Sequence, residues 1–379
     1  MTRKSSRRDF LRGKSAARAM ADAARAALPE DTQSPPPHGR SLQDEDEKGY
    51  LLQICRQAMA CEFEVCLNAG QYSHGMDAAL KALDMIDSLE ALLSIFRDDS
   101  QISEINQFAS DGPVMVDKQV FELLELCARL NRQTDGALDI SAGSLSDAWG
   151  FSRRAGSIPT DADLAEAMRR VGMKNVVLDA EDQSVHFLRS GMRLNLGAIG
   201  KGYALDRAAE VLQAAGIQDF MIHGGQSSVL ALGSSTENQA AMKTSEEETE
   251  SLIAGWTVGV AHPLRSGHRL AEIRLKNRAL ATSGSFRQFF RYQGRRYSHI
   301  LDPRNGQPAQ GVLSATVLAP TAAEADALST AVFVLGHDRS RELLETRMDV
   351  GVMMALPLGG GSRVEIVTFG IPEQDFRII

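Results

Sequence analysis

The sequence predicts an α+β, or mixed α/β, fold, and three observations support this prediction. Candidate strands are short and numerous, candidate helices are few, and the two kinds of element do not alternate regularly. Regular alternation would instead indicate a doubly wound parallel sheet. Hydrophobic residues make up 43% and charged residues 24% of the 379 residues, which is typical of a chain that buries a core. A prior of roughly 150 residues per domain predicts about two domains.

The first 28 residues form a basic segment. They hold eight Lys or Arg and two Asp or Glu, a balance of +6, so the remaining chain carries −14 of the net charge of −8. The motif S-R-R-D-F-L at 6–11 resembles a twin-arginine export signal. Residues 15–28 then form an Ala-rich stretch that charged residues interrupt, a poor apolar core for a signal peptide. Two locations stay open: export to the periplasm or a membrane surface, and the cytoplasm.

Residues 29–49 contain three consecutive prolines and an acidic run, and we expect a solvated linker there. The folded domain is predicted over residues 50–372. Within it, residues 234–254 are polar and acidic, which indicates an exposed insertion. No run reaches the roughly 18 apolar residues of a membrane-spanning helix. The acidity of the main part argues against nucleic-acid binding through phosphate contacts.

The predicted elements follow from hydrophobic spacing along the folded part. Partial alternation predicts a strand at 51–67, and helical spacing predicts helices at 76–93 and 120–132. Residues 139–151 are rich in Gly and Ser, so we expect a loop. The remaining predictions are a helix at 161–171, two strands within 176–188, a strand end at 193–196, a helix at 203–215, and strands at 220–223, 229–232, 256–261, 270–275, 314–319, 350–356 and 364–369.

The four cysteines are Cys55, Cys61, Cys66 and Cys127. They show no C-x-x-C spacing and no pairing with histidine in the sequence. They therefore predict neither a zinc site nor a disulfide framework. We expect each of them to be a small buried apolar residue.

The segment N-L-G-A-I-G-K-G at 195–202 opens the helix predicted at 203–215. Glycines let the backbone approach a ligand, a helix N-terminus presents free N–H groups, and Lys201 adds a positive charge. These features suit a phosphate or a pyrophosphate. The segment matches neither the P-loop nor the dinucleotide fingerprint. The alternative is a Gly-rich helix start with a solvated lysine.

Residues 319–336 predict a helix, with Thr321 and Glu324 at the spacing of a capping box. Asp326 and Thr330 are four residues apart and share one face of this mostly apolar helix. A buried carboxylate without a partner is costly. Mg²⁺, which takes oxygen ligands and keeps waters for a substrate phosphate, would supply that partner. The alternative is an Asp326 that faces solvent or pairs with an arginine.

Two further segments carry candidate catalytic residues. In Y-S-H-I-L-D-P-R-N-G at 297–306, a turn places Ser298 and His299 at the end of an apolar stretch. His299 is the best candidate for a general base or a phosphate contact among eight histidines, although a structural histidine is the alternative. Small residues around Asp139 could admit a flat ring or a ribose. The alternative there is a turn-rich loop with a core tryptophan.

Taken together and in this order, the motifs resemble the ApbE family of FAD:protein FMN transferases over roughly residues 51–369. The resemblance implies many short, mostly antiparallel strands with a few packed helices. The motifs that carry it are A-M-A-C-E-F-E-V (58–65), L-S-I-F-R-D-D-S-Q-I-S-E-I-N (93–106), D-G-A-L-D-I-S-A-G (135–143), N-L-G-A-I-G-K-G-Y-A-L-D-R-A (195–208), Y-S-H-I-L-D-P-R-N-G (297–306) and T-A-A-E-A-D-A-L-S-T-A (321–331).

The resemblance implies an enzyme that binds FAD and Mg²⁺. Such an enzyme moves the FMN half of FAD onto a Ser or Thr hydroxyl of an acceptor flavoprotein and releases AMP. The implied metal ligands are the side chains of Asp326 and Thr330 and the carbonyl of Ala198. His299 would be the base, with Asp139 as the second candidate. The implied FAD-binding residues are Met59, Phe96, Ala137, Leu138, Asp139, Asn195, Lys201, Gly202, Ser298, His299 and Ile300.

The chain departs from the family pattern at three places. Phe96 stands where the family commonly has Tyr, Asn195 stands where it often has Asp, and G-G-Q-S-S at 224–228 replaces a G-G-D pattern. The alternative functions are an FAD pyrophosphatase that forms FMN and AMP, a flavin-binding protein without turnover, and a structural protein without a ligand.

Overall fold

The computed structural model describes residues 50–153, 155–235, 255–286, 288–359 and 363–379. These residues all belong to one unit of the fold, 47–379. The basic segment and the predicted linker lie outside the described residues, as do residues 236–254 of the predicted insertion. Among the described residues, no helix combines the length and the apolar character that crossing a bilayer requires.

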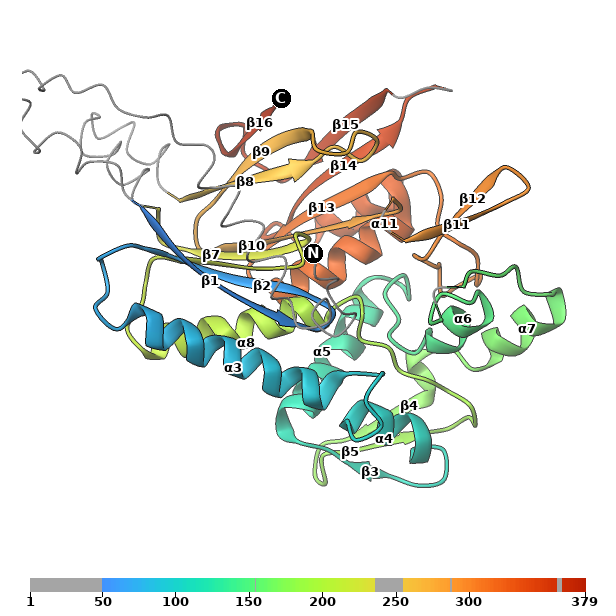
Figure 1. Ribbon diagram of the computed structural model, residues 1–379. Coiled ribbons are helices and arrows are strands. Elements are labelled where there is room, and N and C mark those ends of the chain that lie inside the picture. The colour runs from blue at the N-terminus through green and yellow to red at the C-terminus, as the bar shows by residue number, and fades with distance from the viewer. Residues whose placement is uncertain (1–49, 154, 236–254, 287, 360–362) are drawn as a thin grey trace, which may run out of the picture. The chain divides into compact units, whose positions relative to one another are not determined.

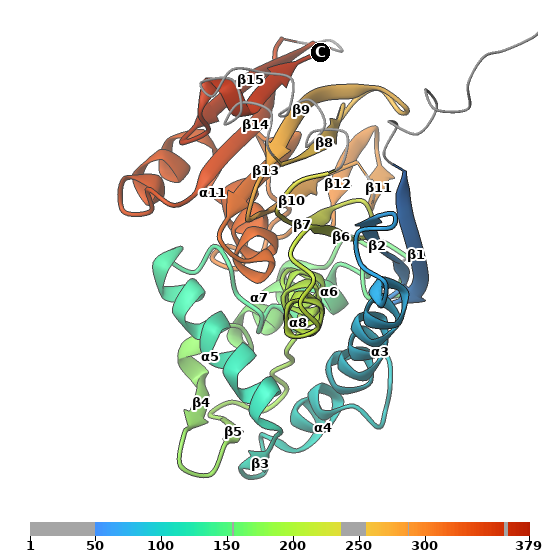
Figure 2. The same ribbon diagram turned by 90° about the vertical axis from the view of Figure 1, so that its left-hand side faces the viewer.

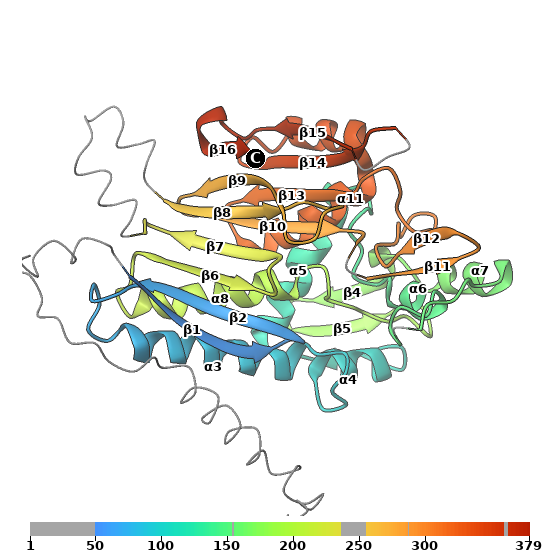
Figure 3. The same ribbon diagram turned by 45° about the horizontal axis from the view of Figure 1, so that its top comes forward.

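An eight-stranded sheet, antiparallel at every pairing, organises the described residues (Figure 1). Figure 3 shows its strands side by side, from the blue β1 to the red β15. In spatial order the strands are β1 (Leu51–Ala58), β2 (Cys61–Asn68), β6 (Phe220–Gly224), β7 (Ser228–Leu232), β10 (Arg278–Gly284), β13 (Ser314–Ala319), β14 (Gly351–Pro357) and β15 (Val364–Phe369).

Three long helices, α3 (Gly75–Leu93), α8 (Gly200–Ala214) and α11 (Ala322–Glu345), pack on one face of this sheet. Figure 2 views α8 nearly end-on, with α3 to one side. Alternate residues of β2, such as Phe63 and Val65, are fully buried against the helices. Thr321 caps α11 by accepting a hydrogen bond from the Glu324 N–H, as the capping box predicts. The helical backbone of α11 breaks at Gly336, where φ is 73°.

A smaller three-stranded sheet packs against the other face of the main sheet. It pairs β16 (Phe376–Ile378), β9 (Arg269–Leu275) and β8 (Trp256–Ala261) in that order. Its Trp256 and Ile273 are buried against Cys66 and Leu318 of the main sheet. Because β16 pairs with β9, the fold continues past residue 372, where the sequence suggested an end.

The remaining elements lie beside these layers. Trp149 is buried among Tyr297, Phe290 and the helices next to it, and its Nε1–H donates to the Gly306 carbonyl (2.8 Å). The elements are α4 (Gln101–Phe108), β3 (Val114–Met115), α5 (Lys118–Gln133), α6 (Gly143–Ala148), α7 (Asp161–Arg169), η1 (Met173–Asn175), β4 (Val176–Asp179), β5 (Ser184–Phe187), β11 (Phe289–Tyr292), β12 (Arg295–Ser298) and η2 (Glu373–Asp375).

The fold corrects the sequence predictions at three places. The strand predicted at 51–67 is a hairpin, because Met59 and Ala60 form a tight turn with φ of 50° and 59°. The loop predicted at 139–151 contains the helix α6. The strand end predicted at 193–196 is limited to one isolated bridge between Ala142 and Arg193. The predicted α+β class, with many antiparallel strands, is confirmed.

The cysteines also differ from the expectation. Cys66 and Cys127 are buried as predicted, whereas Cys61 is half-buried and Cys55 is exposed. Burial raises the pKa of the Cys127 thiol, so that thiol stays protonated at neutral pH.

Candidate active site

The candidate site is built where α8 begins beside α11. Asn195 shapes the approach: its N–H donates to the Ile140 carbonyl (2.7 Å), and its Oδ1 accepts from the Gly197 N–H (2.9 Å). Gly202 is required for packing, because a Cβ there would lie 2.0 Å from the Ala322 carbonyl oxygen of α11. The sequence suggested that glycine serves ligand approach. At Gly202 it serves the contact between two helices.

Asp326 of α11 is the central acid of this junction. Its Oδ2 accepts the Gly202 N–H (3.1 Å), and its Oδ1 accepts the Ser228 hydroxyl of β7 (3.0 Å). The Nζ of Lys201 lies 3.6 Å from Oδ2. The side chain of Asp326 is 8% exposed and that of Lys201 is 24% exposed. The lysine therefore reaches from water toward a carboxylate that is nearly buried.

Thr330 continues the same helix face. Its hydroxyl lies 3.0 Å from the Ser283 hydroxyl of β10, which also lies 2.8 Å from the Ser329 hydroxyl. Asp326 and Thr330 thus face β7 and β10, which are neighbouring strands. This arrangement agrees with the predicted shared face and lines it with oxygen atoms.

His299 belongs to the same electrostatic environment. Its Nδ1 lies 3.0 Å from the Gln288 carbonyl oxygen, an acceptor, so Nδ1 carries the proton and Nε2 keeps a free lone pair. Burial lowers the pKa of His299, the Gln288 hydrogen bond opposes this, and the charge of Lys201 lowers the pKa further. At neutral pH, His299 is therefore a neutral imidazole that can accept a proton. Its neighbours Ser298 and Ile300 are buried, and the Ser298 hydroxyl accepts the Ile300 N–H (3.2 Å).

Asp206 of α8 fixes the position of α11. Its two carboxylate oxygens accept the N–H groups of Ala322 (2.7 Å) and Ala323 (2.9 Å) at the start of that helix. Burial raises the pKa of Asp206 to about 6, and these two hydrogen bonds oppose the change. The sequence analysis gave Asp206 no role, although it lies in a quoted motif.

Asp139 lies in a hydrogen-bond network of its own. Its Oδ1 accepts the Ser141 N–H (2.8 Å) and the Ser141 hydroxyl, and its Oδ2 accepts the Met173 N–H (3.1 Å). Burial raises its pKa, and the hydrogen bonds oppose that change. The backbone of the buried residues Ala137 and Leu138 is also engaged, since the Leu138 carbonyl accepts from Asn131 (2.7 Å). Asp139 therefore anchors its loop.

Met59 and Phe96 lie on turns at the surface. Met59 is half-buried in the β1–β2 turn, and Phe96 is 78% exposed between α3 and α4. Ile95, next to Phe96, lines a cavity of about 620 Å³ beside α4, α6 and α7. That cavity is lined by Ile95, Asp98, Ser103, Asn106, Gln107, Ser144, Asp147, Ala148, Asp163, Glu166, Ala167, Arg170, Gly191, Met192 and Arg193, and so contains no predicted site residue.

Comparisons with known proteins match this chain to one family. The model of the ApbE family matches residues 59–354. The chain belongs to the ApbE family. The FAD:protein FMN transferase of Haemophilus influenzae is 32% identical over 270 residues, which cover 69% of this chain and 73% of that protein. The FAD:protein FMN transferase of Treponema pallidum is 32% identical over 283 residues, or 72% of this chain and 75% of that one.

Solved structures agree with this assignment. The crystal structure of the ApbE protein from Thermotoga maritima has a TM-score of 0.71 at 28% identity and covers 83% of this chain and 96% of its own. The flavin transferase ApbE from Vibrio cholerae has a TM-score of 0.71 at 26% identity. The match covers 84% of this chain and 97% of that one. The predicted family and fold are therefore confirmed for this chain.

In this ApbE-family protein, the structure brings some predicted residues together and leaves others apart. Asp326, Lys201 and Gly202 meet directly, and His299 lies within the field of Lys201. Ala198 is half-buried in the loop that leads to Lys201. Asp139 has its own network of partners.

Sequence reasoning missed three residues of this ApbE-family site. Ser228 and Ser283 come from strands far from α11 in sequence, and a lone serine gives no signal in a strand. Cys61 also lies here: burial raises the pKa of its thiol, the charge of Lys201 lowers it, and the charge of Asp326 raises it. The G-G-Q-S-S segment was a possible signal for Ser228, because the departure from the family pattern at Gln226 lies two residues before it.

Proposed function

We propose that this ApbE-family protein transfers the FMN half of FAD to a Ser or Thr hydroxyl of an acceptor flavoprotein, depends on Mg²⁺, and releases AMP. The observation that supports this proposal is the pairing of Lys201 with Asp326 at 3.6 Å, beside a neutral His299. The pairing joins two segments far apart in sequence, and His299, on a third segment, lies close enough for the charge of Lys201 to lower its pKa. The names of its relatives, FAD:protein FMN transferases, support the same reaction class.

The residues present fit Mg²⁺. The site offers the Asp326 carboxylate and the Thr330 hydroxyl on one helix face, with the hydroxyls of Ser228 and Ser283 behind them. These are hard oxygen donors, which Mg²⁺ prefers over nitrogen or sulfur. Asp326 and Thr330 would hold the ion, together with the Ala198 carbonyl. When bound, Mg²⁺ would neutralise negative charge on the pyrophosphate and on the AMP leaving group.

The proposed reaction is a displacement at phosphorus. The acceptor hydroxyl oxygen attacks the phosphorus of the FMN half of FAD and forms a P–O ester bond. The P–O bond of the anhydride breaks, and its electron pair leaves with AMP. The hydroxyl proton passes to Nε2 of His299, which is free because Nδ1 is held by the Gln288 carbonyl.

Lys201 has two effects in this scheme. Its ammonium group, 24% exposed, can bind the pyrophosphate while it stays close to Asp326. Its charge also adds to the effect of burial in lowering the pKa of His299, so that the neutral imidazole can accept a proton. Asp206 holds the start of α11 against α8, and this contact positions Asp326 toward Lys201.

The test supplies purified protein with FAD, MgCl₂ and a flavoprotein that one of the relatives modifies. We expect a covalent FMN adduct on the acceptor by mass spectrometry and an equal amount of AMP by chromatography. Free FMN and AMP with no adduct would identify the pyrophosphatase alternative. Bound FAD with no AMP would identify a flavin-binding protein without turnover. Either result would overturn the proposal.

We also propose that the arginine pair at 6–11 directs export of the chain. Fusion of residues 1–49 to a reporter that is active only after twin-arginine export tests this. Replacement of Arg7 and Arg8 by Lys should remove the reporter signal. An equal signal from both fusions, or none from the native segment, would favour the cytoplasm.

A further inference from the structure

A second group of chemically reactive side chains lies on the strands β1, β2 and β6. It consists of Glu64 and Cys66 of β2, His223 of β6 and Cys55 of β1, here called the strand cluster. Three ligand atoms, one from each of Glu64, Cys66 and His223, lie within 4.8 Å of one another. Strand pairing causes this proximity: Glu64 stands directly opposite Cys55 on one side and His223 on the other.

Glu64 is the centre of the strand cluster. Its Oε1 lies 3.2 Å from the Cys66 sulfur, and its Oε2 lies 3.4 Å from His223 Nε2 and 3.5 Å from the Cys55 sulfur. The side chain of Glu64 is 14% exposed and that of His223 is 23% exposed. A nearly buried carboxylate is thus surrounded by two thiols, which are weak donors, and by an imidazole at a long distance.

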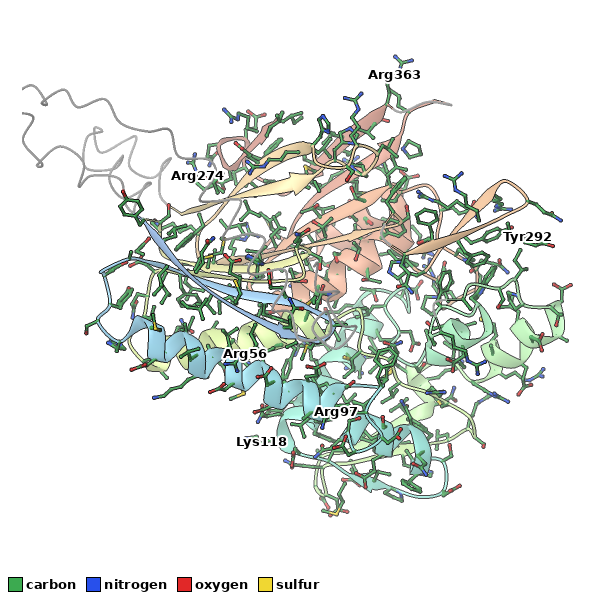
Figure 4. The ribbon with its side chains drawn as sticks, viewed as in Figure 1. Arg56, Arg97, Lys118, Arg274, Tyr292 and Arg363 are labelled. Carbon is green, nitrogen blue, oxygen red and sulfur yellow. The ribbon has the colours of Figure 1, made fainter. Side chains whose placement is uncertain are left out.

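The strand cluster lies on the opposite face of the sheet from Asp326. Ser228 faces Asp326, whereas its neighbour Val229, which pairs with His223, packs toward the small sheet. Adjacent residues of a strand point to opposite faces. Arg56, next to Cys55, confirms this: it pairs with Asp84 and Asp87 of α3 on the helix face, where Figure 4 labels it. The strand cluster is therefore separate from the proposed transfer site.

The chemistry of the strand cluster is that of a transition-metal site. It combines thiol sulfur, imidazole nitrogen and carboxylate oxygen, the three ligand types that zinc accepts. Within the described residues, Nδ1 of His223 is buried and has no hydrogen-bond partner. The other ring nitrogen, Nε2, faces the strand cluster and lies 3.4 Å from Glu64 Oε2, which is long for a hydrogen bond and leaves this nitrogen available to a metal.

We propose that Glu64, Cys66 and His223 bind one zinc ion, with Cys55 beside the fourth coordination position. The ion would replace the thiol proton of Cys66 and join β1, β2 and β6 at the edge of the main sheet. The spacing of the cysteines in the sequence gave no sign of such a site, because its ligands meet only through strand pairing. The sulfur and nitrogen ligands distinguish this site from the transfer site, whose proposed ligands are all oxygen atoms.

The test measures zinc in the purified full-length protein, kept under a reducing agent and passed through a desalting column. We expect one zinc per chain by elemental analysis. We also expect an ultraviolet thiolate-to-metal band when cadmium replaces zinc, and a higher melting temperature with zinc than with a chelator. His223→Gln and Glu64→Gln should each lower zinc retention at least tenfold, and Cys66→Ser should also remove the cadmium band.

Two matched controls separate this site from the transfer site. Cys127→Ser removes a buried cysteine elsewhere, and Asp326→Ala disables the proposed Mg²⁺ site. Both should keep the bound zinc. His223→Gln and Glu64→Gln change half-buried or nearly buried polar groups, so they test the site even where Cys66→Ser fails to fold. Zinc lost on desalting, zinc unchanged in His223→Gln, or a Cys55–Cys66 disulfide in the protein as isolated would overturn the proposal.

Discussion

Asp326, which is buried, and Asp139, which is half-buried, were both candidates for chemistry, and the structure gives them different surroundings. Asp139 accepts hydrogen bonds from the Ser141 N–H and hydroxyl in its own loop and from the Met173 N–H of η1. Asp326 accepts one backbone N–H and one hydroxyl, and its third neighbour is a lysine at 3.6 Å. The first carboxylate is satisfied by the fold. The second faces a partly exposed lysine at a distance too long for a strong ion pair.

The difference shows how the partners of a buried acid indicate its role. A carboxylate that binds backbone amides fixes a loop, and its removal costs stability. A carboxylate beside a flexible cation and several hydroxyls can exchange these partners for a metal and a phosphate. The predictions below test this contrast between the Asp326 region and the Asp139 loop.

The largest effect is expected from Asp326→Ala. The change removes the acid that would hold Mg²⁺, so turnover should fall by at least ~10³-fold, to below detection in an AMP-release assay. Asp326→Asn, which keeps the shape, should be equally inactive if charge is the cause. Asp338→Ala, at an exposed position of the same helix, is the matched control and should be fully active. Full Mg²⁺-dependent activity of folded Asp326→Ala would exclude the metal assignment.

A smaller effect is expected from His299→Ala. Loss of a general base should slow turnover by roughly 10²-fold, and measurable activity should remain because positioning and charge are kept. The pKa of His299 lies below its ordinary value of 6.5, so activity of the native enzyme should fall only as the pH drops through that lower pKa. A pH profile of kcat checks this. If kcat of His299→Ala falls at low pH as kcat of the native enzyme does, the titration belongs to another group.

The sequence predicted those parts of the molecule that depend on local pattern. Amphipathic spacing located α3 and α5, and the capping box located the start of α11. The sequence pattern did not predict the β1–β2 turn, because Met59 and Ala60 adopt positive φ without the usual glycine or asparagine. The hairpin β11–β12 was also missed, since its residues are mostly polar or exposed, as Figure 4 shows for Tyr292 at its tip.

The candidate site was predictable only in part, for a related reason. Asp326 and Thr330 share a helix face through local geometry, so the sequence indicated both. Ser228, Ser283 and the strand cluster depend on which strands become neighbours, and one sequence does not give that order. The position of Asp206 against the start of α11 likewise needs the packing of two helices.

Asp139→Asn should affect stability rather than chemistry. The amide keeps one acceptor oxygen but replaces the other, so a buried N–H of Ser141 or Met173 loses its partner. The free energy of unfolding should fall by about 1–3 kcal/mol in a urea titration, while kcat stays close to that of the native enzyme. A loss of kcat without a loss of stability would return Asp139 to the list of catalytic residues and remove the contrast drawn above.

The smallest effect is a pH dependence carried by Asp206. Burial raises its pKa from 3.8 to about 6, so the folded chain binds this proton more tightly than the unfolded chain does. The stability that the folded chain gains from this tighter proton binding is fully present below pH 3.8 and is lost as the pH rises through about 6. Asp206→Asn removes this titration. The difference in free energy of unfolding, Asp206→Asn minus native, should therefore increase by up to about 3 kcal/mol as the pH rises from about 4 to about 7.

Urea titrations of both chains across this range measure that gain. Lys174→Gln, at an exposed position between two buried residues of η1, is the control, and its difference from the native chain should not change with pH. A constant difference for Asp206→Asn would mean that the carboxylate stays ionised throughout, held by the N–H groups of Ala322 and Ala323. In that case Asp206 would resemble a helix cap whose hydrogen bonds outweigh its burial, and only its contact with α11 would matter for positioning Asp326.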